Sequence, residues 1–285
     1  MKFEILKLLE QNIGQLTKSQ KKVADYIIKN PMQAAFSTID QMANAIGTST
    51  TTIIRLAMHF GYTGFAEFQR ALQELLKSRM GPSTKLEANI KNSNSKSNII
   101  MGIAEQQMEN FKRTFDNLSD DRIFKAEKLL READQIYVSG SRSSYAVAHY
   151  LTFNLNRIFG KCDLLSSDGG DLPEKVNRIK KNDVVVVMSM PRYVKQIVKI
   201  AKIAKDRQAS VIAVTDGYLS PLGQFADILF SVECQSSDFH NSLVPAMLIA
   251  DVLIGVATIK NSELAKKQLK EVENVLEDFD IHVNR

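Results

Sequence analysis

A run of four hydroxyl side chains stands directly before two isoleucines and an arginine in the N-terminal third of the chain. The run is Ser49, Thr50, Thr51 and Thr52, and the arginine is Arg55. Ser and Thr suit the start of a helix better than its interior, and a cap alone needs fewer of them. Hydroxyls and a helix N-terminus can bind phosphate or reach base edges, and an arginine one turn later suits a phosphate or a guanine. These residues indicate a helix that approaches DNA; a capped helix in any small bundle is the alternative.

The spacing around this run fits a helix-turn-helix unit. If Ile39 is the first position, Ala43 is the fifth, where the two helices touch, and Gly47 is the ninth, in the turn. Ile53 and Leu56 then pack the second helix inward. A small residue at the crossing, a glycine that accepts positive φ and apolar anchors are the steric demands of this motif. The second helix is therefore predicted to be the recognition helix.

A second group of polar residues, GSRSS at positions 140–144, follows an apolar segment and opens a helical pattern. Gly140 permits a tight turn, while Ser141, Ser143 and Ser144 supply hydroxyls beside the free N–H groups of the new helix. Arg142 adds a cation that suits phosphate or carboxylate. The loop is not a dinucleotide fingerprint, because GxGxxG is absent. We expect an anion site here; an ordinary strand-to-helix turn with serine caps is the alternative.

A third candidate loop, SMPRY at positions 189–193, follows the apolar segment DVVVVM. Ser189 begins the loop, Pro191 removes a backbone donor, and Arg192 adds a planar cation. Tyr193 offers a stacking face and one hydroxyl. Two arginines at neighbouring strand ends favour an anionic ligand such as a carboxylate or a small phosphorylated metabolite. Alternatively, Arg192 pairs with an acidic residue of a neighbouring subunit.

Several weaker candidate residues also lie at or near the ends of predicted strands. Asp168 to Asp171 could close the pocket, although a simple turn is the plainer interpretation. Asp216 and Gly217 follow another predicted strand, and His240 and Ser242 precede an apolar helical segment.

The elements that must position these residues fall into two sets. Up to about residue 77 every predicted element is helical, beginning with a possible capping box of Thr17 and Gln20 and a helix ended by Pro31. Ser37 and Asp40 are expected to open the next helix. Beyond residue 98, helical patterns at 99–118 and 120–132 precede apolar strands at 135–139, 162–165, 183–189, 210–215 and 227–232, separated by helices such as 143–159, 193–207 and 240–259.

This alternation predicts an α/β domain with a five-stranded parallel sheet covered by helices on both faces. Ligands in such sheets bind at the carboxyl ends of the strands. Residues 78–97, which hold Gly81, Pro82 and many Ser, Asn and Lys residues, read as a linker that could contain a short helix. We therefore expect an all-α DNA-binding domain at 1–77, the linker, and an effector-binding and oligomerisation domain at 98–285.

The charge is divided unevenly along the 285 residues. The net charge is +5, but residues 1–96 hold 13 Lys and Arg against 7 Asp and Glu, while the remainder holds 24 against 25. The excess positive charge favours a polyanion partner for the first part, although a solvated basic surface would look the same. Cys162 and Cys234 match no metal spacing or disulfide framework, and no segment resembles a signal peptide or a membrane span. We expect a cytoplasmic protein with no membrane partner and no cofactor or metal.

Residues 16–72, from LTKSQKKVADYI through the helix-turn-helix to FGYTGFAEFQ, resemble the N-terminal domain of RpiR-type transcriptional regulators. In that family a SIS (sugar isomerase) domain follows, and the five-strand pattern is similar to it. The resemblance implies a ligand-responsive repressor or activator, usually dimeric or larger, with a phosphosugar or similar metabolite as effector. SMPRY resembles the second ligand loop of SIS domains, but it replaces the Ser/Thr/Gly-rich sequence that sugar-phosphate binders usually carry.

The leading hypothesis is a non-enzymatic regulator that binds a double-stranded DNA operator and senses a small anionic metabolite: a phosphosugar, a sugar acid or a related carboxylate. We expect a homodimer or homotetramer, since symmetric oligomers match paired half-sites. A sugar-phosphate isomerase would need a base beside the substrate carbonyl, for which only Glu174 and His240 are candidates. A regulator that has lost its effector and responds to a protein partner is the third possibility.

Overall fold

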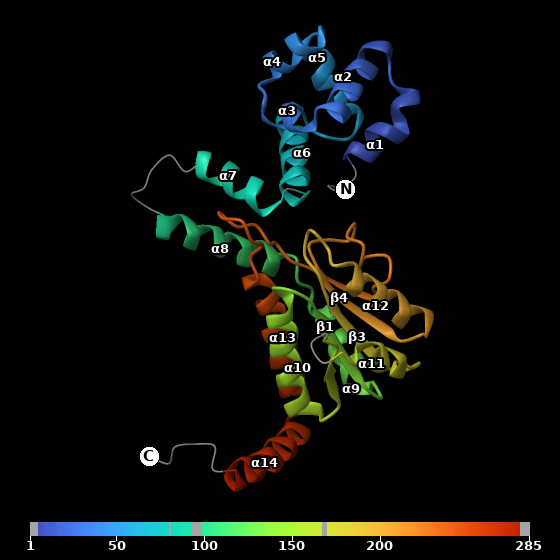
Figure 1. The fold of residues 1–285 in the computed structure, drawn as a ribbon, viewed down its shortest axis with the longest axis vertical. Coiled ribbons are helices and arrows are strands. Elements are labelled where there is room, and N and C mark those ends of the chain that lie inside the picture. Colours follow the sequence, from blue (N-terminus) through green and yellow to red (C-terminus); the bar gives the residue numbers. More distant parts are fainter. Residues whose placement is uncertain (1–4, 80, 93–98, 167–169, 280–285) are drawn as a thin grey trace. The chain divides into compact units, whose positions relative to one another are not determined.

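The chain forms two compact units, Met1–Glu87 and Ala88–Arg285. The structure is a computed structural model that describes residues 5–79, 81–92, 99–166 and 170–279 (Figure 1). Each unit has its own apolar core and is described by itself below.

The regular elements among the described residues of the first unit are all helices, joined by short turns. Its elements are α1 (Ile5–Asn12), a short 3₁₀ turn (Ile13–Gln15), α2 (Lys18–Lys29), α3 (Pro31–Phe36), α4 (Ile39–Ile46), α5 (Thr50–His59) and α6 (Phe65–Arg79). Fully buried Phe68 and Leu72 of α6 pack with Met42 of α4 and with Ile53 and Leu56 of α5. This core fixes α5 by the inward face that the apolar spacing predicted.

Local capping explains where these helices begin and end. Thr17 and Gln20 form the predicted capping box at the start of α2. The start of α4 differs from the expectation, because Thr38 rather than Ser37 is its cap: the Thr38 hydroxyl accepts from the Gln41 backbone N–H. Pro31 ends α2 as expected but also opens α3, since proline fits the first turn of a helix, where no backbone donor is needed.

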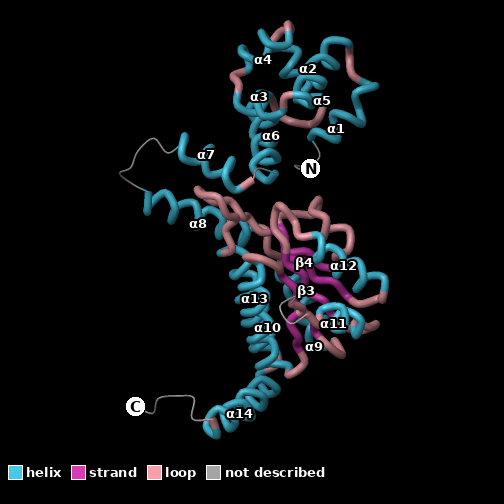
Figure 2. The backbone as a smooth tube through the Cα atoms, viewed as in Figure 1, coloured by secondary structure: helices cyan, strands magenta, loops and turns pink. Residues whose placement is uncertain are grey.

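The second unit contains a five-stranded sheet in which all neighbours are parallel, in the order β2-β1-β3-β4-β5. Figure 1 labels β1, β3 and β4, and Figure 2 shows the strands in magenta among cyan helices. The strands are β1 (Ile136–Gly140), β2 (Cys162–Leu164), β3 (Val184–Met188), β4 (Ser210–Thr215) and β5 (Ile228–Ser231). Its helices are α8 (Ile99–Asp116), α9 (Asp120–Glu132), α10 (Ser144–Phe159), α11 (Leu172–Arg178), α12 (Lys195–Asp206), α13 (Val244–Lys260) and α14 (Ser262–Asp278). The predicted α/β architecture is confirmed.

Alternate strand residues face two different helix layers. Val184 and Val186 of β3 join the core formed with α9, α10 and α13. Val185 and Val187 join the core formed with α11 and α12. Burial on both faces explains why these strands are continuous apolar runs rather than alternating ones.

Two further helices lie outside the clear helical patterns of the sequence, and a short helix was anticipated only at the first of them, within residues 78–97. Helix α7 (Pro82–Asn92) lies inside the segment expected as a linker and continues from the first unit into the second. Helix α14 was not predicted, because most of its side chains are exposed and only Ala265 is fully buried. No single described helix is long and apolar enough to cross a bilayer; α13 and α14 meet that test only as a pair, across a 101° bend.

Replacing Gly140 with alanine is expected to lower the free energy of unfolding of the second unit by about 1–3 kcal/mol. A Cβ at residue 140 would lie 2.5 Å from the Ser144 carbonyl oxygen and 2.9 Å from the Ala148 Cβ, so α10 would have to move. Gly217→Ala is the matched control, because the nearest atom to its Cβ, the Ser231 Oγ, would be 4.0 Å away. Urea denaturation of the full chain measures both, and equal midpoints for the two variants would contradict this packing.

Candidate functional sites

The recognition-helix candidate α5 begins at the hydroxyl run. Ser49 is the N-cap, and its hydroxyl accepts from the Thr52 backbone N–H at 3.3 Å and lies 3.0 Å from the Thr52 hydroxyl. Gly47 ends α4 with a φ of 69°, a left-handed conformation that favours glycine. The turn between α4 and α5 therefore has the geometry that the helix-turn-helix spacing requires.

The outward face of α5 carries the remaining candidates. Thr51 and Arg55 are exposed and Thr50 is half-buried, whereas Ile53, Leu56 and Ala57 on the opposite face are buried. Two residues that the sequence analysis did not single out, Ile54 and Met58, are also exposed on this helix. The face thus presents a hydroxyl, a guanidinium and two apolar side chains to its surroundings.

In the second unit, the loop after β1 turns sharply into α10. Arg142 occupies the left-handed region with a φ of 55°, an uncommon conformation outside glycine that marks a tightly constrained turn. Ser143, the residue before α10, makes no side-chain capping bond, so the first backbone N–H groups of the helix have no hydroxyl cap. The Tyr145 and Ala146 N–H groups donate to the Arg142 and Ser143 carbonyl oxygens, so the helix dipole, and not these two N–H groups, is what favours an anion at this end of α10.

A cavity of about 250 Å³ lies at the carboxyl ends of β1 and β2. Its polar lining comes from the β1 loop, from the segment after β2 and from the start of α12, and its apolar lining comes from α11, α12 and the end of β2. The lining residues are Ser139, Gly140, Ser141, Arg142, Tyr145, Leu165, Ser166, Leu172, Gln196, Ile197 and Ile200. The strand order reverses between β1 and β3, the place where α/β sheets bind ligands.

The loop after β3 does not face this cavity, because a half-buried polar pair holds it to the end of β4. The Tyr193 hydroxyl donates to both carboxylate oxygens of Asp216, at 2.8 and 3.0 Å, and the Thr215 hydroxyl donates to one of them at 3.1 Å. Burial raises the pKa of Asp216, while these hydrogen bonds oppose the rise. Burial, together with the Asp216 charge, also raises the pKa of Tyr193. Tyr193 is therefore a neutral donor that holds the loop to the end of β4.

The structure brings together only part of the predicted effector set. Gly140, Ser141 and Arg142 line the cavity, while Ser143 is exposed and Ser144 is buried beneath the loop. Ser189, Arg192 and Tyr193 are not among the lining residues: Ser189 is buried and accepts from the Val194 N–H at 3.2 Å, and Arg192 is exposed with a left-handed φ of 69°.

The weaker candidates are dispersed. Asp168 lies outside the described residues, whereas Asp171 precedes α11 and pairs with Lys175 at 3.1 Å. Gly217 follows Asp216 at the end of β4, Glu174 is exposed on α11, and the His240 ring lies against the Asp238 carboxylate. Tyr145 and Gln196, which also line the cavity, were not predicted; their places in the first turns of α10 and α12 were the available signal.

Comparison with known proteins gives the family. Residues 3–79 match the helix-turn-helix domain of the rpiR family, and residues 129–256 match the SIS domain. Both domains occur here in one chain, in that order. The chain belongs to the RpiR-type family of transcriptional regulators.

Relatives of this RpiR-type chain match nearly its whole length. It is 26% identical over 275 residues to an uncharacterised HTH-type transcriptional regulator of Caldanaerobacter subterraneus, covering 96% of this chain and 95% of the relative. It is 25% identical over 283 residues to the HTH-type transcriptional regulator HexR of Escherichia coli, covering 96% and 94%. The fold is similar to Vibrio vulnificus NanR complexed with ManNAc-6P, with a TM-score of 0.61 and 22% identity, covering 98% of this chain and 100% of NanR.

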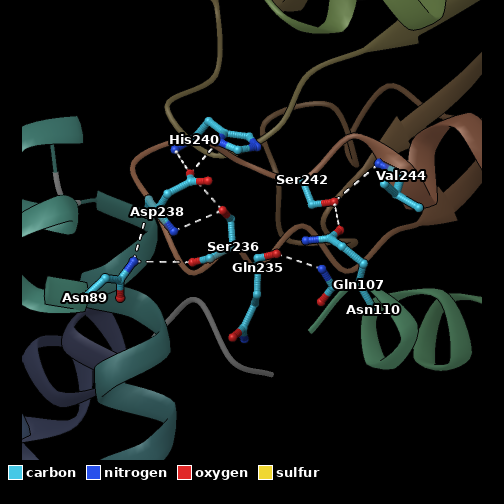
Figure 3. A network of polar contacts seen from close by, with 9 residues as sticks. All are labelled: Asn89, Gln107, Asn110, Gln235, Ser236, Asp238, His240, Ser242 and Val244. Atoms are coloured by element: carbon cyan, nitrogen blue, oxygen red, sulfur yellow. Dashed lines mark hydrogen bonds and ion pairs between the residues drawn. The ribbon is translucent and has the colours of Figure 1, made fainter. Parts of the chain in front are cut away.

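In this RpiR-type chain, the loop between β5 and α13 is tied to two helices by a network of polar contacts (Figure 3). The Asn89 amide of α7 donates to the carbonyl oxygens of Ser236 and Asp238, at 3.4 and 2.9 Å. Buried Asn110 of α8 donates to the Gln235 carbonyl at 2.7 Å, and the Ser242 hydroxyl donates to Gln107.

The same loop also reaches the segment after β3. The Asn241 side-chain amide donates to the Pro191 carbonyl oxygen at 3.1 Å. Residues 233–243, which we call the β5–α13 loop, therefore contact α7 near their first end, α8 at both ends, and the SMPRY segment near their second end.

Tyr193→Phe in this RpiR-type protein is expected to lower the free energy of unfolding by about 1–3 kcal/mol at pH 7, because it removes the donor to the half-buried Asp216 carboxylate. Since the folded-state pKa of Asp216 is raised above 3.8, the carboxylate takes up a proton at a higher pH in the folded state than in the unfolded state. The phenol stabilises the charged form, so the difference between wild type and variant should shrink as the pH falls through that raised pKa.

Thermal or urea unfolding of both proteins from pH 7 down to pH 4 measures this difference. Comparing the two proteins cancels the contribution of Asp183, whose pKa burial also raises. A pH-independent difference would contradict the Tyr193–Asp216 assignment.

Proposed function

We propose that this RpiR-type regulator binds a double-stranded operator through α5 and a small anionic metabolite through the cavity at the end of β1. The observation that carries the effector half is Arg142: it lines a 250 Å³ cavity beside Ser141 and the start of α10. A guanidinium, a hydroxyl and a helix N-terminus in one place favour phosphate or carboxylate.

The cavity also limits the class of effector. Its volume is small for a ligand pocket, which suits a metabolite of a few carbons to hexose size rather than a nucleotide. Leu172, Ile197 and Ile200 form an apolar wall, while Gln196 and Tyr145 add polar groups for hydroxyls. A phosphosugar or a sugar acid fits this combination, and the ManNAc-6P complex of NanR supports the choice.

Binding without turnover is the function that the site residues favour. Glu174 and His240, the two candidate bases for an isomerase, are not among the residues that line the cavity. His240 lies against Asp238 in the β5–α13 loop, and Glu174 is exposed on α11. The named relatives are transcriptional regulators, which supports the same conclusion.

Hydrogen bonds of the β5–α13 loop connect the loop after β3 with α7, the helix that continues into the DNA-binding unit. Asn241 holds the SMPRY segment, and Asn89 holds the other end of the loop only two residues beyond Glu87, where the first unit ends. A ligand that shifts the β3 loop would therefore strain contacts on α7 and α8. We infer that the effector changes operator affinity through this loop.

Self-association is part of the proposal. Large apolar side chains are exposed along α8, α10, α13 and α14, namely Ile99, Ile100, Met101, Ile103, Met108, Phe111, Phe115, Tyr150, Phe153, Val244, Ile259, Leu264, Val272 and Val275. So much exposed apolar surface is unusual for a monomer. It supports a homodimer or homotetramer, which would place two recognition helices on paired half-sites.

Arg55→Ala is expected to weaken operator binding at least tenfold and to lower the slope of log affinity against log salt by about one, because one phosphate or guanine contact is lost. Arg70→Ala, which removes an exposed arginine of α6, is the matched control and should keep near wild-type affinity. The duplex comes from selection on random DNA with the wild-type protein, and affinity is measured by fluorescence anisotropy. Failure to enrich any sequence would contradict the DNA half of the proposal.

A panel of phosphosugars, sugar acids and small carboxylates is expected to contain a compound that raises the melting temperature of the wild-type protein. Arg142→Ala should abolish the shift, because the anion loses its guanidinium. Arg178→Ala, an exposed arginine that precedes the opposite end of β3, should keep it. A shift that survives Arg142→Ala would contradict the site, and no shift with any compound would favour a protein partner as the signal.

A further inference from the structure

The outward face of α5 carries two apolar side chains that neither the core nor the cap explains. Ile54 is 38% exposed and Met58 is 57% exposed, although both lie in a unit with a closed apolar core. Single exposed apolar residues are ordinary, but these two are four residues apart and therefore adjacent on the helix surface.

These residues share their face with the DNA-contacting candidates. At about 100° per residue, Thr51, Ile54, Arg55 and Met58 fall within roughly a quarter to a third of the helix circumference. Buried Ile53, Leu56 and Ala57 occupy the other side. If α5 enters a major groove with Thr51 and Arg55 toward the bases, Ile54 and Met58 must enter with them.

The chemistry of the groove then selects their partner. Among the groups that base pairs present in the major groove, the thymine 5-methyl is the apolar one; the others are hydrogen-bond donors and acceptors. An isoleucine or methionine over a donor or acceptor would remove its water without replacing the hydrogen bond. Against a thymine methyl, the same side chains bury apolar surface.

We propose that Ile54 and Met58 contact thymine methyl groups and so make thymine a required base in each half-site. This inference rests on the proposed DNA-binding function and adds the base that the apolar pair selects. On α5, Arg55 would then make a charged contact, while Ile54 and Met58 would distinguish thymine from the other bases by its methyl group.

The test replaces thymine by deoxyuridine, one position at a time, in the operator selected by the wild-type protein. This exchange removes only the methyl group. We expect uridine at one or two positions per half-site to weaken binding by about fourfold each, as the loss of one buried methyl predicts. In Ile54→Ala or Met58→Ala, thymine and uridine duplexes should bind equally at the corresponding position. Phe36→Ala, which truncates an exposed apolar side chain of α3, should leave the thymine preference unchanged.

The outcomes separate this inference from the proposed function. If selection yields no operator, both are wrong. If an operator is selected but uridine is tolerated at every position, or if the preference persists in both alanine variants, the inference alone is wrong. Sedimentation of Ile54→Ala and Met58→Ala gives a second check, because a changed oligomeric state would assign the pair to a subunit contact and overturn the inference.

Discussion

Helix α10 packs against the end of β1 so closely that residue 140 has no space for a side chain. That contact determines where the strand stops and the helix starts, with Arg142 turned into a left-handed conformation between them. The parallel pairing of β1 with β3 then places the loop that this contact fixes beside the first turns of α12. The cavity, its arginine and the positive end of α10 all depend on this one close approach.

In the second unit, the loop after β1 and the loop after β3 are held in place by different interactions. The β1 loop is fixed by backbone packing, whereas the β3 loop is fixed by side chains: Tyr193 on Asp216 and Asn241 on the Pro191 carbonyl. Side-chain hydrogen bonds can be replaced by hydrogen bonds to a ligand or to water more easily than the close packing of α10 on Gly140 can be altered. A ligand bound beside a fixed β1 loop could therefore displace the β3 loop, and the β5–α13 loop would carry the strain to α7 and α8.

Local sequence signals predicted most of the framework. The capping box at Thr17, the glycine at 47 and the valine run of β3 each act over a few residues, so their structural effects could be inferred without knowing the rest of the chain. The cavity could be predicted only in part, because GSRSS marked one wall while the other wall comes from α11 and α12. Tyr193 was expected to face a ligand, but its partner Asp216 lies 23 residues later. No local pattern could indicate that pairing.

Helix α14 is a second feature that local sequence signals did not predict. Its side chains are mostly exposed and Ala265 alone among its described residues is fully buried in the main core, so burial gave little reason to expect it. Ile54 and Met58 are also apolar residues outside the core. Their role could be inferred only once the structure showed which face of α5 the core leaves exposed. The structure therefore added most to the functional interpretation at exposed apolar residues, whose exposure the sequence did not predict.

The measurement that tests the central claim most directly is operator affinity with and without the metabolite that stabilises the protein. Titration of the selected duplex should show at least a fivefold change in Kd when the metabolite is saturating, the lower end of ordinary allosteric coupling. Asn241→Ala should bind the metabolite and the operator but lose most of that change, because the link between the β3 loop and the β5–α13 loop is cut. An identical Kd with and without metabolite in the wild-type protein would contradict the account.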